Sequence, residues 1–217
     1  MTDWAEHARS ARARFEDGTA RLPVDRDERQ RQLTRMGNAA WAAGLSLLML
    51  GRREEAREWL VSSAETYRES WPEAPAGSWG RPIGALKSRL IAGDLDGAAE
   101  DARWALDAGS AEAESPIGRY AAALAQLVLG CDDEAASLAE SFRGAESIPP
   151  AVTDSVAALA TRDASAYEAA VRSLVADFEA RDAYLEDIPV ADTVLALQAL
   201  AAERWIVLAL DSRVLPA

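Results

Sequence analysis

Residues 51–56 read GRREEA, residues 93–98 read GDLDGA and residues 130–135 read GCDDEA. Each stretch begins with glycine, carries acidic residues within the next four positions and reaches an alanine five positions after the glycine. Glycine tolerates the left-handed conformation that ends many helices, and acidic side chains are favoured near the positive N-terminal end of a helix. Each stretch therefore predicts a turn between two helices, with a small residue where the pair approaches closely. A weaker fourth copy, RDASAY, occupies residues 162–167.

The four predicted turns begin at positions 51, 93, 130 and 162, so they are 42, 37 and 32 residues apart. Spacings of this size are typical of proteins built from stacked helix pairs. The pattern resembles the tetratricopeptide repeat, whose units have about 34 residues. In the first unit, Gly44 and Ala56 match the small positions of the two helices, Gly51 the turn and Leu60 the later apolar position. The resemblance covers about residues 36–180 and implies an all-α array of antiparallel helical hairpins.

We therefore expect a single α-helical repeat domain over residues 1–217. The expected hairpins lie at about residues 36–71, 80–108, 115–143 and 149–181. An N-terminal helix precedes them, and a C-terminal cap of residues 182–217 follows, with a capping helix from about 192 to 204. We expect residues 205–210 to form a short strand or an extended clip, and Leu215 to enter a groove.

The composition narrows the classes of function. The 217 residues are 49% apolar and 27% charged, which is ordinary for a folded domain, and the abundance of alanine favours helix. A net charge of -13 argues against binding to nucleic acid or to an anionic membrane surface. The single histidine and single cysteine exclude a His/Cys metal site and a disulfide within one chain. We find no catalytic signature, so we expect no enzyme activity, no cofactor and no metal.

The sequence also bears on the cellular compartment. Asp3 and Glu6 come early and no apolar segment follows them, unlike in a secretory signal. The longest nearly apolar run, residues 39–50, is shorter than the roughly 20 residues that cross a membrane. We expect a cytoplasmic protein.

The first helices of the expected hairpins would line an inner face, and that face is largely aliphatic. Its predicted members are Asn38, Trp41, Leu45, Leu48, Ile83, Lys87, Leu90, Ile117, Tyr120, Leu124, Leu127, Val152, Val156 and Leu159. Burial of each such apolar side chain is worth about 1.5–3 kcal/mol, so the stripe should be covered. One interpretation is that the N-terminal or the C-terminal helix fills the groove. The other is an open apolar slot for a partner helix.

Five residues are candidates for contact with a partner: Trp71, Trp79, Arg81, Lys87 and Tyr120. The first three lie in WPEAPAGSWGRP, whose prolines and glycines interrupt the helices. Tryptophan and arginine anchor many interfaces, which favours a binding loop. The alternative is that both indoles fold back as lids over the helix ends.

The other tryptophans, Trp41, Trp59, Trp104 and Trp205, lie in periodic apolar segments and are expected in the core.

The end of the chain carries a second resemblance. An alanine- and leucine-rich helix from Asp192 to Ala201 leads into Trp205-Ile-Val-Leu, and DSRVLP closes the sequence at residues 211–216. This is similar to the end of immunity-protein family 49, a set of all-helical bacterial proteins. The resemblance implies binding and neutralisation of a cognate toxin, without catalytic residues.

The expected function is thus non-catalytic protein binding, by an immunity protein or by a general helical-repeat adaptor or regulator that binds a peptide or partner helix. Many toxin domains that attack nucleic acid are basic, so a basic toxin domain would complement this acidic chain. The sequence leaves the oligomeric state open.

Overall fold

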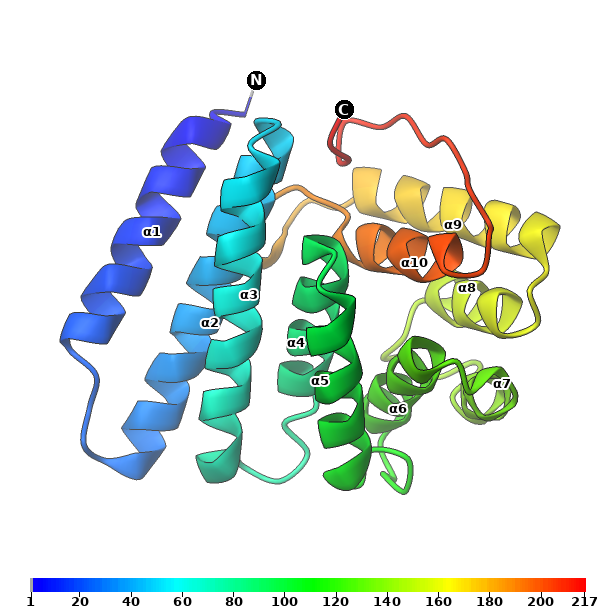
Figure 1. Ribbon diagram of the computed structural model, residues 1–217, viewed down its shortest axis with the longest axis horizontal. Helices are drawn as coiled ribbons and strands as arrows, with labels where there is room; N and C mark the ends of the chain where they lie inside the picture. The colour runs from blue at the N-terminus through cyan, green and yellow to red at the C-terminus, as the bar shows by residue number, and fades with distance from the viewer. Residues whose placement is uncertain (1) are drawn as a thin grey trace.

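The computed structural model describes residues 2–217, which form ten α-helices and no strand (Figure 1). The helices are α1 (Trp4–Ala20), α2 (Arg26–Met49), α3 (Arg53–Ser70), α4 (Gly80–Ala92), α5 (Leu95–Asp107), α6 (Pro116–Leu129), α7 (Asp132–Ser141), α8 (Pro150–Ala160), α9 (Ala164–Glu179) and α10 (Asp192–Ala202). Two short 3₁₀ turns are η1 (Trp71–Glu73) and η2 (Leu185–Asp187). The expected all-α class is confirmed.

Helices α1 to α9 pack in chain order, each against the next (Figure 1). The predicted turns separate them where expected. Gly51, Gly93 and Gly130 have φ values of 73°, 68° and 75°, the left-handed conformation that a glycine tolerates best. In the fourth turn a non-glycine residue, Arg162, adopts the same conformation with φ 55°.

The small residue of each turn motif lies where two helices meet. Ala56, Ala98 and Ala135 are fully buried, as predicted. Between α2 and α3 the approach is close enough that a Cβ added at Gly44 would lie 2.6 Å from Leu60 Cγ. Residue size therefore sets the separation of this helix pair.

The apolar inner face is covered by the C-terminal part of the chain. Helix α10 leaves the chain-order packing and contacts α4, α8 and α9. Its Leu197 joins the same buried cluster as Leu90, Leu124 and Val156. Of the two interpretations, the structure supports a filled groove, with the C-terminal helix as the filling element.

The segment that leads into α10, residues 180–191, continues this cover; we call it the strap. Ile188 and Val190 are buried in a cluster with Trp41, Leu45 and Leu60 of α2 and α3. The N-terminal helix α1 packs on α2.

The last residues of the chain follow α10 without forming a strand, so the extended-clip alternative applies. The backbone N–H of Ala191 donates to the carbonyl of Val214 at 2.8 Å. Leu215 is buried, as expected.

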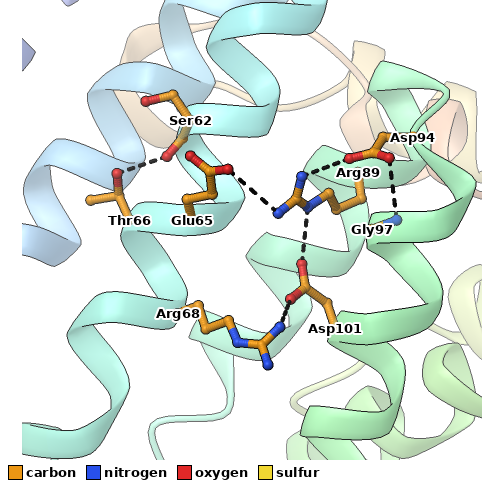
Figure 2. A network of polar contacts seen from close by, with 8 residues as sticks. All are labelled: Ser62, Glu65, Thr66, Arg68, Arg89, Asp94, Gly97 and Asp101. Atoms are coloured by element: carbon orange, nitrogen blue, oxygen red, sulfur yellow. Dashed lines mark hydrogen bonds and ion pairs between the residues drawn. The ribbon is translucent and has the colours of Figure 1, made fainter.

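A buried carboxylate ties α3, α4 and α5 together (Figure 2). Asp101 of α5 accepts from Arg68 Nη1 of α3 at 2.9 Å and from Arg89 Nε of α4 at 3.2 Å. Arg89 also donates to Asp94, the residue that caps α5. Burial raises the pKa of Asp101, and the two guanidinium groups oppose that rise. This network positions α4, which carries two of the candidate site residues.

Candidate functional site

A cavity of about 400 Å³ lies among α2, α4 and the strap before α10; we call it the inner cavity. Its lining residues are Thr34, Asn38, Trp41, Tyr67, Ser78, Gly80, Arg81, Ile83, Gly84, Lys87, Leu185 and Asp192. The wall thus combines apolar side chains with polar and charged ones, as small-ligand sites do. Two predicted site residues, Arg81 and Lys87, lie together in this wall.

Arg81 lies in the first turn of α4 and not in the preceding loop, and only 7% of it is exposed. Its Nε donates to Thr34 Oγ1 at 3.2 Å, and its Nη2 donates to Gln30 Oε1. Both acceptors are neutral. Its Nη1 has no hydrogen-bond partner among residues 2–217. Burial lowers the pKa of this guanidinium, because desolvation disfavours the charged form.

The start of α4 lacks the usual compensation for its positive end. Trp79 at the N-cap accepts no hydrogen bond from the first turn through its side chain, and the first turn contains no acidic residue. By contrast, Asp94 caps α5 and Ser115 caps α6. The helix terminus and Arg81 therefore add two positive contributions at one end of the inner cavity.

Lys87 is the other cation of the wall, and it is paired. Its ammonium contacts the carboxylate of Asp192 and donates to Thr193 Oγ1 at 3.1 Å. Both charged side chains of this pair are largely buried. The pair fastens the start of α10 to α4, so Lys87 has a structural role here.

Tyr67 contributes a neutral hydroxyl to the wall. The hydroxyl donates to Asn38 Oδ1 at 2.7 Å. Burial raises the pKa of Tyr67, and the nearby Asp192 and Glu186 carboxylates raise it further. The hydroxyl is therefore protonated at neutral pH and serves as a hydrogen-bonding group.

The two loop tryptophans pack against each other instead of projecting outward. The rings of Trp71 and Trp79 are 5.4 Å apart, and Trp71 also meets Trp104 edge-on at 5.8 Å. Trp79 is only 9% exposed, and its indole lies against Gly118 at the start of α6. This placement favours the lid interpretation.

Tyr120 is also buried and meets Phe142 edge-on, and it is not among the residues that line the inner cavity.

A different tryptophan is exposed. Trp205 was expected in the core, but 92% of it is accessible, and Val207 is 84% accessible; we call these two residues the Trp205 patch. The core expectation was wrong because Trp205 follows the end of α10 at Ala202 and lies in a turn, with φ 60°. Beside it, Arg204 is buried and donates to the carbonyls of Leu127 at 2.8 Å and Leu200 at 3.0 Å.

Sequence reasoning therefore missed two site features, the Asp192 partner of Lys87 and the outward Trp205. The solitary lysine on an apolar face was a usable signal for the first, since a buried ammonium needs a counter-ion. The apolar sequence around Trp205 gave no signal that its side chain would be exposed.

Among residues 2–217, no group of three or more His, Cys, Asp or Glu side chains is placed to hold a metal ion. None of the described helices combines the length and the apolar character needed to cross a membrane. Comparison of the chain with protein-family models, with curated proteins and with solved structures finds no match.

Proposed function

We propose that this chain is a non-catalytic protein-binding protein, built as a tetratricopeptide-like array, whose partner docks on the Trp205 patch. The observation that carries the proposal is the exposed indole of Trp205 on a left-handed backbone. A bulky residue in this conformation costs free energy, and such costs concentrate at functional sites. Tryptophan is also the residue type most enriched among the anchors of interfaces.

The underlying structure fixes the chain next to this indole. The neighbouring Arg204 is fixed by two backbone carbonyls and by Asp132 of α7. The chain is therefore anchored one residue before the exposed ring, which reduces the backbone conformational entropy lost when a partner binds. Preorganisation of this kind favours binding.

The partner we propose is a basic protein. The chain has a net charge of -13, which attracts positively charged surfaces and speeds their encounter. The Trp205 patch also lies in the segment that resembles the immunity-protein family. The specific form of the proposal is therefore a protein that binds and neutralises a toxin domain.

The rival proposal, an adaptor that receives a partner helix in its apolar groove, has less support. That groove holds α10, and the Lys87–Asp192 ion pair keeps α10 on α4. A partner helix would have to displace it.

The test compares two tryptophans. A partner is first captured from the native host, identified, purified and titrated against the parent chain and the variants Trp205→Ala and Trp79→Ala. We expect Trp205→Ala to weaken binding by about 2 kcal/mol without lowering the melting temperature. Trp79→Ala should lower the melting temperature and leave the affinity of the folded fraction unchanged.

Unchanged affinity of Trp205→Ala would overturn the Trp205 patch as the docking site. For the immunity form, the purified partner should be toxic when expressed alone, and co-expression of the parent chain should restore growth. Co-expression of Trp205→Ala should restore it less. A non-toxic partner would favour the adaptor.

A further inference from the structure

The inner cavity contains a positive charge without a counter-charge. Arg81 has only neutral hydrogen-bond acceptors, Thr34 and Gln30, and no ion pair joins it to any of residues 2–217. A buried charge is costly unless it is paired. The start of α4 makes the cost larger, because the positive end of the helix dipole lies there and its first turn contains no acidic residue.

Two carboxylates lie in or near the cavity wall, and neither removes this charge. Asp192 is paired with Lys87. Glu186, on the strap, contacts Arg14 of α1 at 3.0 Å. Each is held by another cation. Of the two cations in the cavity wall, Lys87 is therefore paired with a carboxylate and Arg81 is not.

The other side chains of the wall indicate the chemistry of the uncharged part of a ligand. Trp41, Ile83 and Leu185 present apolar surface beside the charged groups. The volume of about 400 Å³ falls in the range of about 300–1,000 Å³ that small-molecule sites occupy. Because Asn38 Oδ1 accepts from Tyr67, the amide nitrogen of Asn38 is left to donate. The wall therefore offers hydrogen-bond donors and a cation together with apolar contact surface.

We propose that the inner cavity binds a small organic acid, with its carboxylate on Arg81 at the start of α4 and its apolar body against Trp41 and Ile83. Guanidinium groups bind carboxylates through charge-assisted hydrogen bonds, which are stronger than neutral ones. A bound carboxylate supplies the counter-charge that the fold lacks. The site is separate from the Trp205 patch and does not depend on the function proposed above.

The first experiment titrates the purified chain by calorimetry with 4-phenylbutyrate and hexanoate, and with the primary amide of each acid. We expect each acid to bind at least tenfold more tightly than its amide, because only the acid compensates Arg81. Inorganic phosphate tests the apolar contacts, and a tripeptide with a free C-terminus, compared with its amidated form, tests a chain end as the source of the carboxylate.

Each result of this titration supports or overturns a different part of the proposal. Acids that bind no better than their amides would overturn the proposal, and phosphate binding as tightly as the acids would overturn the apolar part of it. A free acid that exceeds the tripeptide supports a small molecule as the ligand. Tighter binding of the free-ended tripeptide would instead assign the cavity to a polypeptide terminus.

The second experiment supplies a carboxylate from within the chain. A Cβ at Gly80 has no atom within 4 Å, so a side chain fits there, in the wall of the inner cavity. We expect Gly80→Glu to weaken 4-phenylbutyrate binding at least tenfold more than Gly80→Gln, which has the same size without the charge. Ala176→Glu, on the exposed surface of α9, makes the same charge change elsewhere and should leave the affinity unchanged.

Arg81→Gln should abolish the preference for acid over amide, and Gly80→Glu keeps the test decisive if Arg81→Gln fails to fold. Equal affinities of Gly80→Glu and Gly80→Gln would contradict the placement of the carboxylate. Trp205→Ala should bind 4-phenylbutyrate like the parent chain, so this proposal and the proposed function can fail separately.

Discussion

Two arginines contact the same carboxylate of Asp132 from very different surroundings. The side chain of Arg204 is 5% exposed and also donates to two backbone carbonyls, whereas that of Arg162 is 66% exposed. A buried donor that satisfies several acceptors matters more than an exposed ion pair, which is screened by water.

We therefore expect Arg204→Met to lower the free energy of unfolding by about 1–3 kcal/mol, because buried acceptors lose their donor. Urea unfolding monitored by circular dichroism would measure it. Arg162→Met is the matched control and should cost less than about 1 kcal/mol. Equal losses in the two variants would mean that Arg204 does not anchor the end of α10.

For single residues such as Trp205, the sequence did not predict whether the side chain is buried or exposed. Trp205-Ile-Val-Leu reads as core by composition alone, yet a single left-handed residue turns the indole outward. Backbone conformation at one position depends on how Arg204 is held, and that depends on α6 and α7, which are distant in the sequence. Arg81 was selected by residue type, but its burial and its lack of an ion pair could be seen only in the structure.

At the scale of elements, helix pairs are spaced by small residues. Ala98 is fully buried on α5. We expect Ala98→Leu to lower the free energy of unfolding by about 1–3 kcal/mol, because added methylenes overpack the contact. Glu100→Leu adds an apolar side chain to the exposed surface of the same helix and should change stability by no more than about 0.5 kcal/mol. A thermal melt of Ala98→Leu that matched the parent would refute the close contact.

Turns and helix pairs were predictable because their determinants are local. A glycine, an acidic first turn and a small residue lie within six positions, and the structure places Gly93 and Gly130 in the left-handed conformation. The filling of the groove was not predictable in this way. Periodicity shows that a face is apolar, but it does not show which of two terminal helices will cover it.

At the scale of the whole molecule, α10 closes the inner face. Leu197 of α10 is fully buried there. We expect Leu197→Asp to displace α10 and to increase binding of a hydrophobic dye several-fold, with most helical circular dichroism retained. Ala202→Asp, at the exposed end of α10, should bind dye like the parent chain. Low dye binding by Leu197→Asp would indicate that α10 does not protect the stripe.

The fold-back of α10 has a consequence for biosynthesis. Helices α1 to α9 contact their neighbours in the chain, so each pair can form as soon as it emerges during translation. Lys87 must wait for Asp192, a separation of 105 positions. At about 5–20 residues per second, the 42 positions between the ends of α8 and α10 take about 2–8 s to synthesise. During those seconds the nascent chain exposes an aliphatic stripe, and it should be a substrate for ribosome-associated chaperones until its final helix arrives.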